Sequence, residues 1–119
     1  MKNPSELSVL ARWDHDLATI VLRGELDITS ASRAERCLAG VLSRKPCRLV
    51  VDVAGLAFMD TQGVKLLARA RRGLPAGRDV IIRDPNPSVH RMLALTGIDQ
   101  VCIVEGQRLP PLPGAQSTA

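Results

Sequence analysis

A hydroxyl at the start of a predicted helix is the side chain best placed to do chemistry in this sequence. Thr61 follows Asp60, a residue type that favours helix N-caps, and precedes the apolar run that begins at Val64. The hydroxyl is expected to be exposed, because the chain has just left a strand at this point. A phosphate there would meet free backbone N–H groups and the positive end of the helix dipole.

Three cations share a helix face with this hydroxyl. Lys65, Arg69 and Arg72 follow Thr61 at intervals of four, four and three residues. Such a stripe is either a solvated surface or a contact face for an acidic partner. A phosphate on Thr61 would add about −1.5 to −2 charges. The free protein would tolerate that charge near Lys65, whereas a closely packed complex with an acidic partner would not.

Four carboxylates offer a second candidate chemistry, at Glu25, Asp27, Asp52 and Asp60. Asp60 is better explained as a helix cap, and Asp52 as part of the end or edge of the central strand. The sequence has no nucleophile elbow, no phosphate-binding loop and no dinucleotide fingerprint. No nucleophile–base pair supports hydrolysis either. We therefore expect no enzyme activity, no cofactor and no metal.

The composition is that of one soluble globular domain. The 119 residues are 45% apolar and 24% charged, and one Trp, one Phe and no Tyr leave an aliphatic core. The net charge of +4 favours an acidic partner surface. Nucleic acid is disfavoured because the basic residues are scattered and no aromatic platform exists for bases.

The cysteines and histidines carry no expected function. Cys37, Cys47 and Cys102 are far apart and lack ligand spacing, so we expect buried free thiols in a reducing cytosol and no zinc site. His15 lies in a predicted turn, and His90 is expected to have a surface or capping role. No signal peptide or membrane span is expected, since no long apolar stretch occurs. We expect a cytoplasmic protein.

Strands and helices alternate at short spacing along the chain. Strands are predicted over Ser8–Trp13 and Leu17–Leu22 as a hairpin, in a buried central run from Cys47 through Val53, and over Asp79–Arg83 and Gln100–Val104. Helices are predicted after Ile28-Thr29-Ser30 with a Ser32–Glu35 capping box, from Thr61 to a C-cap and loop at Arg71–Gly77, and over Ser88–Thr96 with Gly97 as C-cap.

This pattern predicts an α/β fold with a mixed sheet of about five strands, parallel apart from the first hairpin strand, and helices packed on it. Sites in such folds gather at the carboxyl ends of the strands. Gly24–Asp27 and Met59–Gly63 both follow strands, so both are expected at one end of the molecule. The domain is predicted over residues 1–104, followed by a disordered Pro/Gly-rich tail over 105–119.

Three stretches resemble the STAS domain of bacterial anti-sigma factor antagonists. Gly24–Asp27 with Thr29-Ser30-Ala31 is similar to the family's G-E-(I/L)-D segment. Val51–Val53 with Phe58–Val64 is similar to its strand and F-x-D-S-S-G-(L/V) signature. Val89–Asp99 resembles its third helix and the turn that follows. The resemblance covers residues 8 to 104 in the family's order of elements.

The resemblance implies a function in partner switching. In that family the unphosphorylated antagonist binds an anti-sigma factor that is also a serine/threonine kinase, which frees a sigma factor. The kinase phosphorylates the first Ser of D-S-S-G and a phosphatase reverses the reaction. Thr61 matches that Ser and is the implied phosphoacceptor. The implied partner-binding residues are Glu25, Leu26, Asp27, Thr29, Asp60, Thr61, Gln62, Gly63, Lys65 and Arg69.

The motif in this chain reads D-T-Q-G, which leaves other STAS functions open. Threonine keeps the hydroxyl but restricts χ1, and Gln62 replaces a small residue. A D-T-x-G motif also resembles the small STAS subunit of bacterial phospholipid-transport ABC complexes, which docks on the ATPase. The lead-in Phe58-Met59 and the stretch Leu95–Asp99 favour the antagonist. A stressosome-like scaffold is a further alternative, although we expect no extra N-terminal domain.

Overall fold

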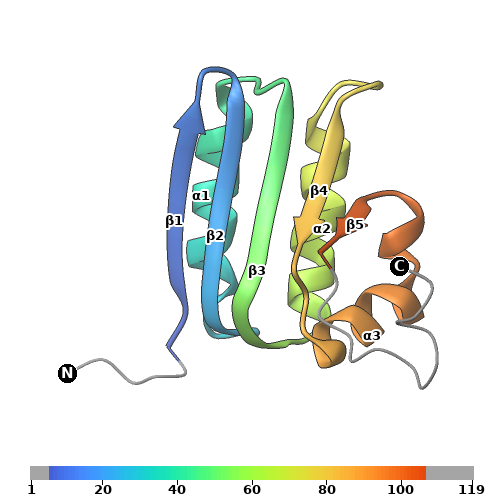
Figure 1. Cartoon of the computed structure of the whole chain (residues 1–119). Coiled ribbons are helices and arrows are strands. Elements are labelled where there is room, and N and C mark those ends of the chain that lie inside the picture. Colours follow the sequence, from blue (N-terminus) through green and yellow to red (C-terminus); the bar gives the residue numbers. More distant parts are fainter. Residues whose placement is uncertain (1–5, 107–119) are drawn as a thin grey trace.

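Eight helices and strands and one short 3-10 helix form the fold in a computed structural model, which describes residues 6–106 (Figure 1). The strands are β1 (Ser8–Asp14), β2 (Leu17–Leu26), β3 (Arg48–Met59), β4 (Asp79–Arg83) and β5 (Ile103–Glu105). The helices are α1 (Ala31–Ser43), α2 (Thr61–Gly73), α3 (Pro87–Thr96) and the 3-10 helix η1 (Ile98–Gln100). The predicted element order is confirmed.

The strands form one sheet in the order β1-β2-β3-β4-β5. β1 pairs with β2 antiparallel, and every other neighbouring pair is parallel. The mixed, mostly parallel sheet is thus confirmed. Because β2, β3 and β4 run the same way, the three helices that follow them all begin at the same end of the sheet (Figure 1).

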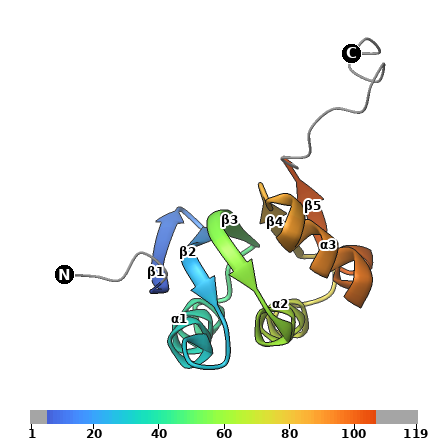
Figure 2. The same ribbon diagram turned by 90° about the horizontal axis from the view of Figure 1, so that it is seen from below.

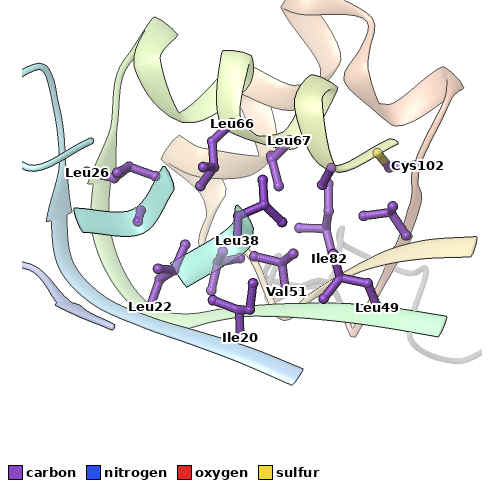
Figure 3. Packing of buried hydrophobic residues seen from close by; sticks show 14 of the residues in the cluster. Ile20, Leu22, Leu26, Leu38, Leu49, Val51, Leu66, Leu67, Ile82 and Cys102 are labelled. Carbon is purple, nitrogen blue, oxygen red and sulfur yellow. The ribbon is translucent and has the colours of Figure 1, made fainter. Parts of the chain in front are cut away.

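The main core lies between the sheet and two helices. α1 and α2 lie side by side on one face of the sheet (Figure 2). Leu38 of α1 and Leu67 of α2 are each 1% exposed and point toward Ile20 and Val51 of the sheet (Figure 3). The expected aliphatic core is confirmed, since the main cluster holds no buried aromatic side chain among the described residues.

β3 is buried on both faces, although α1 and α2 cover only one. Leu49, Val50 and Val51 are 0%, 1% and 2% exposed, so consecutive side chains on opposite faces are equally buried. Val50 and Ile81 of β4 are buried outside the main cluster. The uninterrupted apolar run in the sequence predicted this two-sided burial, which is typical of parallel central strands.

Several element ends differ from the prediction. β2 continues to Leu26 and β3 to Met59, because register shifts between the two strands let pairing continue past Arg23 and Gly55. Gln100 belongs to η1 rather than to a strand, since its N–H donates to the carbonyl of Gly97 at 3.0 Å.

The bounds of two helices and of the last strand also differ slightly from the prediction. The residues Arg71 to Gly73 lie in α2 and not in a loop, and α3 begins one residue early, at Pro87. Glu105 is the last residue of β5, where its side chain lies 3.5 Å from Nε of Arg83. The rest of the predicted tail, from residue 107 onward, lies outside the described residues.

The expectation of three buried thiols is wrong for Cys47. Cys102 is buried and Cys37 is half-buried, whereas Cys47 is exposed. Cys47 lies in the loop before β3, where its thiol donates a hydrogen bond to Oδ2 of Asp16 at 3.0 Å. A carboxylate partner satisfies this thiol at the surface, so it has no need of an apolar environment.

Candidate functional site

The carboxyl ends of β2 and β3 meet, as their shared direction predicts. Leu26 pairs with Met59 and Glu25 with Phe58 in the parallel register. The backbone N–H of Asp60 donates to the carbonyl of Leu26 at 3.1 Å. This bond fixes the start of α2 against the end of β2. The two predicted segments therefore lie together at one end of the molecule (Figure 1).

Asp60 is the N-cap of α2, which confirms the prediction. Its Oδ1 accepts the N–H of Gln62 at 2.8 Å, and its carbonyl accepts the N–H of Gly63 at 3.0 Å. Thr61 occupies the first helical position and is exposed. The expectation of free N–H groups around a phosphate is wrong for Gln62 and Gly63, because the cap already takes both. A phosphate on Thr61 would instead lie next to the Asp60 carboxylate.

Two of the predicted partner-binding residues are buried. Leu26 is 1% exposed, and Gly63 is a buried residue in the first turn of α2. A Cβ on Gly63 would overlap the side chain of Met59 and come within 3.0 Å of Cδ2 of Leu26. Neither residue offers a side chain to a partner. Their role is to let α2 pack closely on the strand ends, which sets the position of Thr61.

A hydrogen-bonded turn links β2 to α1. Oδ1 of Asp27 accepts the N–H and the hydroxyl of Thr29 at 3.0 and 2.7 Å, and the N–H and hydroxyl of Ser30 at 3.2 and 3.1 Å. The hydrogen bond from the Thr29 side chain is the largest cause that holds the pKa of Asp27 below its ordinary value. Ser30 is the N-cap by position, but its side chain makes no capping bond.

One of the three cations on this face of α2 already forms an ion pair with another residue of the protein. Nη1 of Arg69 lies 2.9 Å from Oε2 of Glu35 on α1, so this ion pair bridges the two helices. Glu35 therefore serves that contact and not the predicted capping box with Ser32. Lys65 and Arg72 are exposed, and neither has a carboxylate within 4.0 Å among the residues described.

Two exposed apolar side chains at this end were missed as site residues. Ile28, in the turn before α1, is 74% exposed, and Phe58, near the end of β3, is 44% exposed. Phe58 pairs in register with Glu25, a predicted site residue. The available signal was the presence of bulky apolar residues beside polar ones at two strand ends. Single exposed apolar residues are common on protein surfaces, so these two become candidates for a protein contact only through their place beside the predicted site residues.

The surroundings favour a protein contact over a small ligand. An open hollow of about 340 Å³ beside the β2–α1 turn is lined mainly by polar and charged side chains, among them Glu25, Asp27 and Thr29. Small-molecule sites are usually enclosed and apolar. Within residues 6–106, no three His, Cys, Asp or Glu side chains cluster so as to hold a metal ion. The described helices are all too short or too polar to cross a membrane.

Two bacterial proteins are similar to this chain in sequence. The anti-sigma-F factor antagonist RsfB of Mycobacterium tuberculosis is 28% identical over 68 residues, which span 57% of this chain and 56% of that protein. The match thus covers just over half of the relative. The anti-sigma F factor antagonist of Paenibacillus polymyxa is 27% identical over 99 residues, with 80% of this chain and 85% of that protein covered.

Solved structures show the same architecture at low sequence identity. An anti-sigma factor antagonist from Mycobacterium paratuberculosis superposes with a TM-score of 0.80 at 23% identity, over 99% of this chain and 97% of that one. SpoIIAA in its unphosphorylated form gives 0.72 at 21% identity, over 82% and 88%. A family model described as "Mlab, STAS domain" matches residues 9–105. The chain therefore belongs to the STAS domain family.

Proposed function

We propose that this protein is an anti-sigma factor antagonist. In its unphosphorylated form it binds an anti-sigma factor of the serine/threonine kinase type in the cytoplasm and so releases a sigma factor. Phosphorylation of Thr61 switches it off, and a cognate phosphatase restores it. The observation that carries the proposal is the exposed Thr61 at the first position of α2, joined to the Glu25–Asp27 segment through the bond from Asp60 to Leu26. The names of the two bacterial relatives support the same function.

The partner docks on what we call the Thr61 surface. It consists of exposed and half-buried side chains from the ends of β2 and β3 and the starts of α1 and α2, namely Glu25, Asp27, Ile28, Thr29, Phe58, Asp60, Thr61, Gln62 and Lys65. Ile28 and Phe58 supply the apolar area that anchors a protein contact. The polar residues around them form the rim. Leu26 and Gly63 are buried under this surface. Arg69 lies at its margin, where it forms an ion pair with Glu35.

Phosphorylation acts through charge at a closed interface. A phosphate carries about −1.5 to −2 charges and stands next to the Asp60 carboxylate. In the free protein, water solvates both groups and Lys65 lies one turn away. In the complex, the phosphate must lose its water without gaining a cation, so binding is lost. A penalty of about 3 kcal/mol corresponds to a loss of affinity of about 10²-fold.

The test combines phosphorylation and binding. The purified protein is incubated with candidate anti-sigma kinases and ATP, and intact mass is followed for wild type, Thr61→Ala and Thr96→Ala. Thr96 is the matched control, because it is an exposed threonine on α3, outside the Thr61 surface. We expect one phosphate on wild type and on Thr96→Ala, and none on Thr61→Ala. Phosphorylated wild type should then bind about 10²-fold more weakly.

A second function uses the same surface without a phosphate cycle. The threonine in D-T-Q-G favours a STAS subunit that docks on the ATPase of a phospholipid-transport ABC complex. Such a subunit would co-purify with a membrane ATPase and would gain no phosphate from soluble kinases. Binding to an anti-sigma kinase without phosphate transfer would identify a constitutive antagonist. If no such kinase binds, the transporter subunit becomes the better assignment.

A further inference from the structure

The outer edge of β1 is open within residues 6–106. All seven residues of β1 pair with β2, and no described strand pairs with its other edge. On such an edge, alternate residues direct their N–H and C=O groups away from the sheet, where another strand can pair with them. β1 contains no proline to prevent this pairing. It lies at the margin of the sheet, far from β5 (Figure 1).

A groove lies between this edge and α1. It has a volume of about 370 Å³ and is lined by Leu7, Ser8, Val9, Arg33, Arg36 and Cys37. Figure 2 shows α1 directly beneath β1 and β2, so an added strand would lie beside the helix. The groove also adjoins the hollow at the Thr61 surface, because Leu7 and Arg33 line both.

The helix side of the groove is basic and open. Arg33 and Arg36 are exposed, and no carboxylate of the described residues lies within 4.0 Å of either. At the far end of β1, Arg44, the C-cap residue of α1, stacks on Trp13 with its guanidinium carbon 4.0 Å from the ring centroid. A Cβ added at Gly40 would have no atom within 4 Å. The side of α1 next to β1 therefore has cations without partners and room for another segment.

The chain itself offers no matching acidic segment. Residues 1–5 and 107–119 contain no Asp or Glu, whereas each contains one basic residue, Lys2 and Arg108. A second copy that paired through β1 about a two-fold axis would bring two sets of arginines together, which is repulsive. Charge complementarity therefore selects an acidic segment from another protein.

We propose that the β1 edge binds an extended acidic segment of a partner protein as an added sixth strand. Backbone hydrogen bonds to the outward groups of β1 give the pairing, and alternate side chains give the specificity. Carboxylates on the helix side pair with Arg33 and Arg36, while the apolar side chains that alternate with them lie on the opposite face, beside the 48% exposed side chain of Leu10. The proposal is independent of Thr61 and of any kinase.

The test uses purified protein and a defined probe. A fluorescein-labelled peptide of alternating glutamate and valine is titrated at physiological ionic strength and followed by anisotropy. We expect saturable binding and amide chemical-shift changes centred on Ser8–Asp14. Arg36→Glu should weaken binding about fivefold or more, because it replaces an ion pair by a like-charge contact. Arg91→Glu on α3 is the matched control, since it makes the same charge change at an exposed arginine of another helix, and should weaken binding less than about twofold.

Further probes separate this proposal from its rivals. A lysine–valine peptide, and a glutamate–valine peptide with alternate N-methylated amides, should bind at least about tenfold more weakly. Thr61→Glu should leave peptide affinity unchanged, so failure of the kinase experiment does not affect this test. No binding up to about 1 mM would overturn the proposal. Equal losses from Arg36→Glu and Arg91→Glu, equal binding of the N-methylated peptide, or a dimer through β1 in sedimentation would overturn it as well.

Discussion

Asp27 shapes the turn that brings α1 to the Thr61 surface. Its Oδ1 is the common acceptor for two backbone N–H groups and two hydroxyls of Thr29 and Ser30. These bonds favour the ionised carboxylate, so the pKa of Asp27 is lower in the folded protein than its ordinary value of 3.8. A residue predicted to bind a partner thus has a structural role that precedes any binding.

The sign of the shift predicts how the turn responds to acid. Because the folded pKa lies below the unfolded one, the stabilisation is present above the unfolded pKa of 3.8 and is lost as pH falls through the folded pKa. NMR titration should therefore place the Asp27 carboxyl below 3.8, and Thr29→Ala should raise its pKa, since it removes the largest cause of the shift. A wild-type Asp27 that titrates at or above 3.8 would contradict this account.

Cys47 is exposed, but a hydrogen bond to a neighbouring carboxylate is expected to lower the reactivity of its thiol. Its thiol donates a hydrogen bond to Asp16, which raises the pKa of Cys47 and lowers the pKa of Asp16. The thiolate is the reactive form of cysteine, so a raised pKa slows alkylation.

Asp16→Asn removes the carboxylate that raises the pKa of Cys47. This variant should lower that pKa and speed the reaction of Cys47 with iodoacetamide at neutral pH, as followed by peptide mass mapping. Half-buried Cys37 serves as the internal control and should react at an unchanged rate. Cys102, whose pKa burial raises to about 11, should stay unmodified in the folded protein. An unchanged Cys47 rate would show that the hydrogen bond does not control its reactivity.

Helix α2 depends on a glycine where it meets the strands, whereas α1 contains one that it does not need. Gly63→Ala would place a methyl group against Met59 and Leu26 and should destabilise the protein by about 1–3 kcal/mol. Gly40→Ala lies inside α1 with no atom within 4 Å of the new Cβ, so it should stabilise by about 0.5–1 kcal/mol. Urea unfolding of both variants measures the two effects against wild type. Equal effects would mean that helix propensity, and not packing, decides both sites.

Local patterns were enough to predict most of the elements. Asp79–Arg83, the Asp60 N-cap and the Gly97 C-cap each depend on a few neighbouring residues, and the structure confirms all three. The continuation of β2 and β3 past Arg23 and Gly55 depends on register shifts between strands that are distant in sequence. The alternation of apolar and polar residues along a single strand does not indicate such a shift in its pairing with another strand.

The same distinction applies to the candidate site. The placement of Thr61 follows from a local cap, so the sequence predicts it. The ion pair of Arg69 with Glu35 and the burial of Leu26 arise only when α1, α2 and β2 pack together. Ile28 and Phe58 appear apolar in the sequence, and their exposure of 74% and 44% depends on the fold as a whole. The sequence places both residues at strand ends beside polar ones, but only the folded structure shows that their side chains are exposed.

The molecule as a whole has helices α1 and α2 on one face of its sheet and a buried apolar strip on the other. Val50 of β3 and Ile81 of β4 are paired in register, and so are Asp52 and Arg83 two residues later. They are 1% and 7% exposed, yet they lie outside the main cluster. Part of the stability therefore comes from the face of the sheet that the two helices do not cover.

This second face can be tested by matched truncations. Val50→Ala and Ile81→Ala each remove buried apolar atoms and should cost about 1–4 kcal/mol, as in an ordinary core. Leu10→Ala in β1 is the control, because its side chain is 48% exposed and little burial is lost, so its cost should stay within about 0.5 kcal/mol. The urea midpoint reports each change in stability, provided that m, the slope of the unfolding free energy against urea concentration, stays constant. A constant m shows that two-state unfolding is retained. A wild-type midpoint for Val50→Ala would mean that stability comes from the helix-covered face alone. A lowered midpoint would show that the face of the sheet without α1 and α2 contributes to the stability of the fold.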